Sequence, residues 1–326
     1  MTAGERRAAP AGRRRRLGVI GSFVWDVIHG RDARAVPVEE WGGITYALGA
    51  LDAALPEDWE IVPVMKVGAD LAPQARDFLQ TLRRLAPDAA LVEVPYPNNR
   101  VELRYFSDER RSEVLRGGVP GWSWLGLTPL LRDLDALYVN LISGFELDLE
   151  TAQLIRQHFR GPIYCDLHSL VLAVQPSGLR TPRPLPNVAD WCRCFDLLQV
   201  NEDELAMMAP DPLALAATAM AAGVRCLVVT LGSRGAVYFA APDFERLADV
   251  SLSIVAFRYA PPALRGDDAM LDQLNKRIME QLQHDGAAFV TNTLVHGRFA
   301  LRACILHPET TSEDLEALLE IIRASG

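Results

Sequence analysis

The sequence has few of the features of secreted, membrane-spanning or zinc-stabilised proteins. Its 326 residues include five cysteines, an odd and scattered set without paired Cys-x-x-Cys spacing, which argues against a disulfide framework and a structural zinc site. Cys192 and Cys194 flank one arginine, a spacing too short for a zinc knuckle. No apolar run approaches the roughly 20 residues that a membrane helix needs. No apolar signal core follows the N-terminal arginines. These absences predict a cytoplasmic protein with no membrane partner.

The chain also lacks an overall positive charge. Its formal net charge is −9, so no body-wide basic field is available to hold nucleic acid, and no nucleic-acid partner is expected. Near the N-terminus, arginines cluster locally at residues 6–7 and 13–16. Short blocks of like charge are typical of disordered segments, so residues 1–16 are predicted to be a disordered basic tail. An arm that binds phosphate groups is the open alternative.

What the chain does have is a rhythm of short apolar runs and helix-like stretches. The first run, Leu17-Gly-Val-Ile-Gly21, ends in glycine, as a buried parallel strand that opens into a loop does. Strands that alternate with helices predict an α/β fold in three layers, with a parallel sheet between helices. Ligands of such sheets bind beyond the carboxyl ends of the strands. Further strands are predicted at 61–64, 136–141, 162–166, 197–200 and 226–231, and helices at 44–54, 71–85, 149–159, 202–209 and 212–222.

Two segments break this rhythm. The stretch from Val92 to Val114 is one of them, because polar and apolar residues alternate over Arg100–Phe106, which predicts a small β lid over the sheet. After about residue 250 the order changes to strand, helix, strand, strand, helix, which predicts a separate small α+β module over residues 251–326.

Several segments, taken in order, resemble the ribokinase-like PfkB family of carbohydrate and nucleoside kinases. The similarity covers residues 17–250, and its specificity comes from the order and spacing of motifs that are weak singly. The matching segments are Gly18-Val-Ile-Gly-Ser-Phe-Val-Trp-Asp26, Trp41-Gly-Gly-Ile-Thr-Tyr-Ala47, Lys66-Val-Gly-Ala-Asp70, Asn201-Glu-Asp-Glu204 and Thr230-Leu-Gly-Ser-Arg-Gly235.

The resemblance implies an activity and a set of site residues. It implies ATP-dependent transfer of a phosphoryl group, with Mg²⁺, to a hydroxyl of a small sugar or nucleoside. By the family's motifs, the substrate is bound by Asp26, Gly42 and Gly43. The metal and phosphates are ordered by Asn201 and Glu204, of which Glu204 is the metal-binding residue. The nucleotide site is lined by Thr230, Gly232 and Gly235. The chemistry is suitable, since a carboxylate accepts hydrogen bonds from hydroxyls and glycines expose amides to phosphate. The plain alternatives stay open: a loop or cap for the aspartate, ordinary turns for the glycines and a solvated helix face for the glutamate.

Two departures from the family pattern bear on catalysis. The family has an asparagine where this chain has Ala47, so one substrate contact is missing. The family's Gly-Ala-Gly-Asp segment, which supplies an anion hole and the catalytic base, does not occur in the sequence. The nearest substitute places Gly266, Asp267 and Asp268 before a predicted helix. Either aspartate is a candidate base, with Gly266 at the phosphate, and the simpler alternative is that both cap that helix.

A second resemblance covers residues 251–326. Ser251-Leu-Ser-Ile-Val-Ala-Phe-Arg-Tyr259 and Gly297-Arg-Phe-Ala-Leu-Arg-Ala-Cys304 look like the C-terminal small domain of group II pyridoxal-dependent decarboxylases. That chemistry requires a lysine that forms a Schiff base with the cofactor. The chain has two lysines, Lys66 and Lys276, and neither follows a histidine as the family's lysine does. Pyridoxal phosphate is therefore not expected.

The sequence thus predicts a PfkB-type carbohydrate kinase domain, incomplete at its catalytic segment and fused to a decarboxylase-type module. The alternative is a non-catalytic protein that binds nucleotide or sugar, or interacts with a partner. A rearranged gene without a selected function is the third. A homodimer is an open possibility for its assembly.

Overall fold

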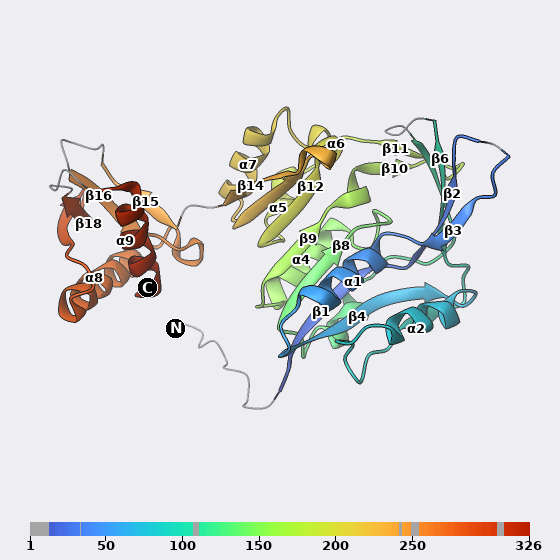
Figure 1. Ribbon diagram of the computed structural model, residues 1–326, viewed down its shortest axis with the longest axis horizontal. Helices are drawn as coiled ribbons and strands as arrows, with labels where there is room; N and C mark the ends of the chain where they lie inside the picture. The colour runs from blue at the N-terminus through green and yellow to red at the C-terminus, as the bar shows by residue number, and fades with distance from the viewer. Residues whose placement is uncertain (1–12, 33, 107–110, 241–242, 249–253, 305–309) are drawn as a thin grey trace. The chain divides into compact units, whose positions relative to one another are not determined.

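The computed structural model describes residues 13–32, 34–106, 111–240, 243–248, 254–304 and 310–326 (Figure 1). The chain divides into two compact units, Met1–Phe239 and Ala240–Gly326, called unit 1 and unit 2 below. The sequence pattern predicts the boundary between the two parts at residue 250. Residues 244–246 belong to unit 2 because they form a strand that pairs with residues 257–259.

A sheet of eight strands forms the centre of unit 1. Its strands are β1 (Arg15–Ser22), β4 (Trp59–Gly68), β5 (Val92–Val94), β8 (Ala136–Asn140), β9 (Ile163–Asp166), β12 (Leu197–Asn201), β13 (Cys226–Thr230) and β14 (Ala236–Ala240). Their order is β14-β13-β12-β9-β8-β1-β4-β5. All neighbouring pairs from β13 to β5 are parallel, as expected for short apolar strands that are buried on both faces. The strands predicted from the sequence are confirmed.

Helices cover both faces of this sheet and make the predicted three layers (Figure 1). Successive residues of β1 point to opposite cores, with Val19 in one and Ile20 in the other. The core around Val19 includes residues of α1 (Ile44–Ala54) and α2 (Ala72–Gln80). The core around Ile20 includes residues of α3 (Trp124–Leu127), α4 (Leu149–His158), α5 (Val188–Cys192) and α7 (Pro212–Ala221). Burial of these two apolar surfaces is the main force that holds the layers together.

A second sheet of four strands, the lid, is connected directly to the end of β1. Its strands are β2 (Val24–His29), β3 (Val38–Trp41), β6 (Asn99–Tyr105) and β7 (Arg111–Arg116), in the order β3-β2-β6-β7. The prediction of a lid between residues 92 and 114 is confirmed for β6 and β7, whereas β5 belongs to the main sheet and β2 and β3 also belong to the lid. A hairpin of β10 (Leu172–Val174) and β11 (Arg180–Pro182) contacts β7 through a bridge from Leu179 to Val114.

The N-terminal arginines differ in part from the prediction of a tail over residues 1–16. Residues 1–12 lie outside the described part of the chain. Arg15 and Arg16, however, begin β1. The Arg15 guanidinium lies 2.7 Å from Asp58, and that of Arg16 lies 2.6 Å from Asp88. The positive charges are thus paired with carboxylates of the same unit, which allows the strand to start earlier than its apolar residues.

Unit 2 has the predicted order of strand, helix, strand, strand and helix, preceded by one further short strand. Its elements are β15 (Phe244–Arg246), β16 (Ile254–Tyr259), α8 (Asp268–Asp285), β17 (Thr291–Val295), β18 (Arg298–Cys304) and α9 (Ser312–Ala324). The sheet order is β15-β16-β18-β17, and neighbouring strands are antiparallel. Unit 2 has a hydrophobic core of its own, which includes Phe257, Leu274, Ile278 and Leu301.

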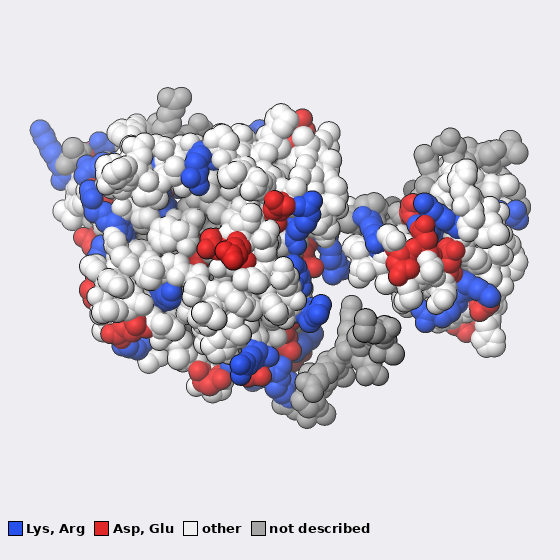
Figure 2. Space-filling view, turned by 180° about the vertical axis from the view of Figure 1, so that it is seen from behind, with Lys and Arg blue, Asp and Glu red and all other residues white. Residues whose placement is uncertain are grey.

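The surface shows basic and acidic side chains side by side. On the face in Figure 2 most of unit 1 is uncharged, and groups of acidic and of basic side chains both occur on it. Among the described residues, no helix is both long and apolar enough to cross a membrane.

Asn275 on α8 allows a test of unit 2. Its fully buried amide accepts a hydrogen bond from the Tyr259 N–H at 2.7 Å and donates to the Tyr259 and Leu271 carbonyls, each at 2.8 Å. Asn275→Ala leaves these buried groups unpaired, so we expect a loss of about 2 kcal/mol of stability. Hydrogen exchange of β16 and α8 should become roughly 30-fold faster. Gln273→Ala, on the exposed face of the same helix, is the control; equal exchange in the two variants would contradict this role.

Candidate functional site

Asp26 lies on the lid strand β2, directly against Gly42. The Gly42 N–H donates to the carbonyl of Val24 at 2.9 Å, which holds the end of β3 beside β2. A Cβ atom at position 42 would lie only 2.0 Å from Oδ2 of Asp26. Glycine is therefore required here for the close approach of a carboxylate to the backbone. The structure brings together two of the residues that the sequence predicts to bind substrate.

Gly43, the third predicted substrate residue, starts α1. Its φ of +40° lies in the left-handed region, which disfavours residues with a side chain. A Cβ atom there would also lie 2.2 Å from Cδ1 of Ile142, in the loop after β8. The diglycine thus joins the lid to the loop at the carboxyl end of the sheet, and it is more than an ordinary turn.

Charged side chains of three further strands act on Asp26, namely Arg111 and Glu113 on β7, Arg180 on β11 and Glu40 on β3. Burial is the main reason that the pKa of Asp26 rises to about 6, and the nearby Glu113 carboxylate adds to the rise. Arg111 and Arg180 act in the opposite direction. Arg111 and Glu113 are two residues apart on β7, so their side chains share one face of the lid, and the Arg111 Nε donates to Glu113 at 2.8 Å.

Arg180 connects four segments around this site. Its side chain is only 3% exposed, and Nη2 donates to the carbonyls of Ile142 and Ser143 at 3.1 and 3.0 Å. Nη1 donates to the Ser169 hydroxyl at 3.2 Å and lies 3.4 Å from Glu113. A buried guanidinium with this many partners fixes the position of the lid relative to the loop after β8.

At the carboxyl edge of the main sheet, four adjacent strands end in polar residues. Asn140 at the end of β8 is the register partner of Asp166 at the end of β9. Asn201 at the end of β12 is the partner of Thr230 at the end of β13. Because the strands are parallel, these four side chains belong to one edge.

Asn201 and Glu204 form a reciprocal cap at the start of α6 (Glu202–Ala206). The Asn201 side chain accepts from the Glu204 N–H at 2.8 Å. The Glu204 carboxylate accepts from the Asn201 N–H at 2.9 Å and from its side-chain amide at 2.6 Å. Glu204 is only 7% exposed, so it does not lie on a solvated helix face. Burial raises its pKa to about 8, and the negative charge of Asp166 contributes to the rise.

Asp166, which is half-buried, is the second carboxyl group of this edge. Burial raises its pKa to about 6. It accepts a hydrogen bond from the side-chain amide of Asn140 at 3.3 Å. The Oδ1 atom of Asn140 is buried and has no hydrogen-bond partner among the described residues. Such an atom has lost its water without a replacement, which is unfavourable unless a further group binds.

The oxygen atoms of this edge fit a magnesium ion better than a transition metal. Within the described residues, no group of three or more His, Cys, Asp or Glu side chains could enclose a metal. Two carboxylates and an orphaned amide oxygen nevertheless suit Mg²⁺, which is commonly held by one or two carboxylates and completed by water and phosphate oxygens. Asp166, Glu204 and Asn140 are the residues that would hold it.

The segment after β13 is a tight glycine turn that faces open space. Gly232 and Gly235 have φ of +56° and +95°, and no atom lies within 4 Å of a Cβ built at either position. The Leu231 N–H donates to the Gly235 carbonyl at 2.7 Å, which closes the turn. Arg234 within the turn pairs with Glu202 of α6. The turn therefore lies beside the Asn201–Glu204 cap.

Gly266, Asp267 and Asp268, the predicted substitute for the family's catalytic segment, belong to unit 2. The Asp267 carboxylate accepts from the Met270 N–H at 3.0 Å and so caps α8. Asp268 lies 2.8 Å from Arg258 and 3.2 Å from Arg298. The hydrogen bond from Arg258 lowers the pKa of Asp268, which makes it a weaker base. Each carboxylate thus has a local partner in unit 2, as the capping alternative implies for Asp267.

Solved structures show what this fold is similar to, whereas no family model matches the chain. A pyrophosphate-dependent kinase of the ribokinase family aligns with a TM-score of 0.55 and 13% identity, over 82% of this chain and 88% of its own. The same kind of kinase with a pyrophosphate analogue and myo-inositol gives 0.53 and 14%, over 81% and 88%. The Burkholderia thailandensis nucleoside kinase with inosine gives 0.50 and 16%, over 69% and 72%. The predicted ribokinase-like α/β fold is confirmed.

A curated protein is similar to part of the sequence. The aromatic-L-amino-acid decarboxylase of Bacillus atrophaeus is 31% identical over 84 residues, which are 26% of this chain. The match spans only 17% of the length of that decarboxylase.

The contact between Gly42 and Asp26 gives a matched pair of variants. Gly42→Ala should destabilise unit 1 by about 1–3 kcal/mol, because the new methyl group displaces the Asp26 carboxylate. Gly49→Ala, on the exposed side of α1 with no atom near its Cβ position, should be stabilising by up to about 1 kcal/mol. Tryptophan fluorescence in urea can measure both, since all six tryptophans are in unit 1. The same sign for both changes would show that position 42 is not constrained as described.

The raised pKa of Asp26 predicts a pH-dependent effect of Asp26→Asn. The folded state disfavours the ionised carboxyl group, so this cost appears as pH rises from about 4 through the folded pKa of about 6 and is constant above it. Asparagine carries no such cost. The stability of Asp26→Asn relative to the native protein should therefore increase by ~1 kcal/mol between pH 4 and pH 7, after allowance for partial solvent screening. Urea unfolding at each pH measures the difference; a constant difference would contradict the burial of this carboxylate.

Proposed function

We propose that unit 1 transfers a phosphoryl group from a magnesium-bound donor to a hydroxyl of a small sugar, polyol or nucleoside. The observation that supports this most is the pairing of two polar sites in one unit. Asp26 on the lid lies against the diglycine, and Asp166 and Glu204 lie at the carboxyl edge of the main sheet. A fold alone does not establish an activity, so the proposal depends on these side chains.

The lid site suits an acceptor with several hydroxyl groups. An ionised Asp26 offers two oxygens that accept hydrogen bonds from neighbouring hydroxyls. With a pKa of about 6, it is ionised at neutral pH. Myo-inositol and inosine, bound by two of the similar kinases, are molecules of this kind.

The sheet edge suits the donor. The turn at Gly232 and Gly235 would bind phosphate oxygens through the Gly232 N–H, because the Gly235 N–H already donates to the Gly232 carbonyl at 3.1 Å. Asp166, Glu204 and Asn140 would hold Mg²⁺, which when bound neutralises charge on the phosphates. Because metal binding requires ionised carboxylates, the pKa of about 8 at Glu204 favours donor binding at higher pH. We take ATP as the donor, and pyrophosphate is the alternative suggested by the pyrophosphate-dependent neighbours.

The proton acceptor of the reaction would have to be a carboxylate that is free to bind the acceptor's hydroxyl. Asp267 and Asp268 are the proposed bases from the sequence, but the first caps α8 and the second pairs with two arginines. These contacts favour the second candidate function, in which unit 1 binds donor and polyol without efficient transfer. Positioning and charge stabilisation still contribute to phosphoryl transfer where a base is lacking.

We further infer that the chain is a fusion, in which unit 2 carries the decarboxylase resemblance. Pyridoxal chemistry is not part of this proposal. Lys66 donates to the Gly121 carbonyl at 2.6 Å and lies 4.4 Å from the Trp122 ring centroid, and Lys276 is exposed on α8. Neither arrangement suggests a lysine that holds a cofactor.

The test is donor consumption by the full chain, with ATP or pyrophosphate and Mg²⁺, against a panel of sugars, inositols and nucleosides. We expect turnover that falls at least tenfold in Glu204→Gln through weaker donor binding, and a higher KM for the acceptor in Asp26→Asn. Glu150→Gln, an exposed residue of α4, is the charge-matched control.

Asp267→Asn and Asp268→Asn test whether either aspartate is the catalytic base, and ATP binding decides between the two candidate functions. Turnover lost in either variant would make that aspartate the base. Turnover unchanged in both would eliminate them. Magnesium-dependent ATP binding by calorimetry without turnover on any acceptor would leave the binding function alone, and no binding at all would refute both.

A further inference from the structure

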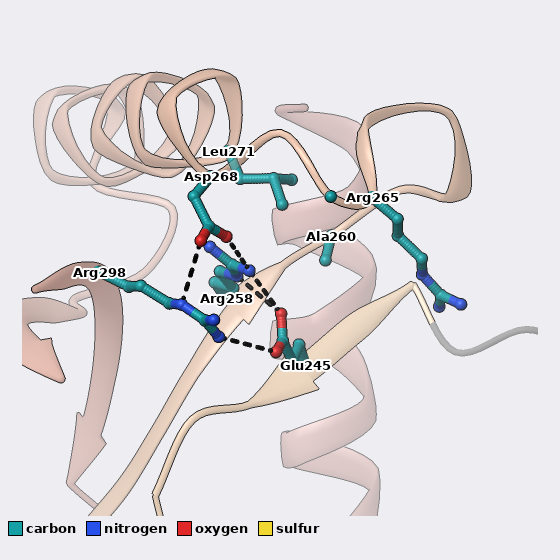
Figure 3. Close-up of a pocket in the computed structure, with 8 residues that line it drawn as sticks. Glu245, Arg258, Ala260, Arg265, Asp268, Leu271 and Arg298 are labelled. Atoms are coloured by element: carbon teal, nitrogen blue, oxygen red, sulfur yellow. Dashed lines mark hydrogen bonds and ion pairs between the residues drawn. The ribbon is translucent and has the colours of Figure 1, made fainter. Parts of the chain in front are cut away.

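The ion pairs in a cavity of unit 2 balance one another. Nη2 of Arg258 lies 2.7 Å from Glu245 and 2.8 Å from Asp268, and Arg298 lies 3.5 and 3.2 Å from the same two carboxylates. Figure 3 shows this ring of ion pairs, with Arg265 directed away from it. The ring carries two positive and two negative charges, so it offers no net charge to a ligand.

A cavity in unit 1 has a different lining. Its volume is about 350 Å³, and it is lined by side chains from two segments, residues 124–134 and 158–161. These segments lead into β8 and β9, so the cavity lies at the amino ends of these strands. The length of the two strands separates it from Asn140 and Asp166 at their carboxyl ends. The cavity is therefore distinct from the candidate kinase site.

Aromatic and aliphatic side chains form much of this lining. The rings of Trp124 on α3 and His158 at the end of α4 are stacked, with centroids 5.1 Å apart and an angle of 26° between their planes. Leu131, Leu134 and Phe159 add apolar surface. An apolar lining with a few polar groups is typical of sites for small molecules. Aromatic side chains also pack favourably with a further ring, either offset or edge to face.

The charged side chains of the lining are Arg132 and Arg160. Within the described part of the chain, neither guanidinium has an ion pair or a hydrogen bond, and no aspartate or glutamate lines the cavity. Asp133 and Asp135 are close in sequence but outside the lining, and Asp135 pairs with Arg13 at 2.9 Å. The lining therefore carries two positive charges without a partner, which makes it complementary to an anion.

The carboxyl end of α4 opposes an anion only weakly. A helix C-terminus has a partial negative charge from its last carbonyl groups. Here Arg156 donates to the carbonyls of Phe159 and Gly161 at 2.7 and 3.3 Å, and its other terminal nitrogen pairs with Asp196 at 2.8 Å. Because a guanidinium already binds these two carbonyls, the charges of Arg132 and Arg160 determine the sign of the potential in the cavity.

We propose that this cavity binds a small aromatic molecule that has one anionic group, a carboxylate or a phosphate. The ring packs against Trp124, His158 and their apolar neighbours, and Arg132 and Arg160 bind the anionic group. A planar guanidinium suits a two-point contact with such a group. The site does not depend on phosphoryl transfer, so failure of the proposed kinase activity would leave it unaffected.

The experiment is a fluorine NMR titration of the full chain labelled with fluorotryptophan, in which Trp124→Phe assigns the Trp124 resonance. Naphthoate, naphthyl phosphate and the neutral naphthamide are added separately at constant ionic strength. The Trp124 resonance should shift along a saturable curve with an anion, and naphthamide should bind about tenfold more weakly. The anion that binds more tightly identifies the group. The Trp25 resonance, on the lid, reports separately on the acceptor site proposed for unit 1.

Substitutions that remove one charge make the result specific. Arg132→Gln and Arg160→Gln should each weaken the affinity for the anion about tenfold and leave that for naphthamide unchanged. Arg225→Gln, an exposed arginine before β13, should change neither affinity. A Trp124 shift that does not saturate with either anion, equal affinities for the anions and naphthamide, or an equal loss in Arg225→Gln would overturn the proposal.

Discussion

The parallel register of β8, β9, β12 and β13 is the constraint on which the candidate site depends. It pairs Asn140 with Asp166 and Asn201 with Thr230, so the polar ends of separate strands become neighbours. A shift by one residue would exchange the two faces of a strand and move its apolar side chains out of a core. The burial that fixes the register therefore also fixes the polar edge.

The sequence was sufficient to predict the layers and part of the site. Apolar runs of strand length, separated by helix-length stretches, specify a parallel sheet, and the strand-end position of Asp166 follows from the same pattern. The diglycine at 42 and 43 is predicted through the resemblance to the PfkB motif, and the structure adds the physical reason, since the close approach of a carboxylate and a positive φ both require glycine.

Other residues of the candidate site could not be predicted, because their roles depend on contacts between segments that are distant in the sequence. Arg180 comes from a proline-rich stretch that resembles a loop, yet its guanidinium reaches Ile142, Ser169 and Glu113. Alternation on β7 does place Arg111 and Glu113 on one face, but the sequence does not say that this face meets Asp26. For Asp267 the sequence offers two interpretations, because an aspartate directly before a helix can be a catalytic base or a helix cap. The structure shows the local contact of a cap, a hydrogen bond from the Met270 N–H.

The Asn201–Glu204 cap has a consequence for α6. The carboxylate that would coordinate an ion is the one that accepts from the Asn201 N–H and side-chain amide at the first turn of a five-residue helix. A helix this short has little stability of its own. Rotation of the Glu204 side chain toward an ion would leave the Asn201 backbone N–H without its acceptor, so ion occupancy and fraying of this turn are thermodynamically coupled. Arg234, paired with Glu202 on that turn, would transmit the fraying to the glycine segment after β13.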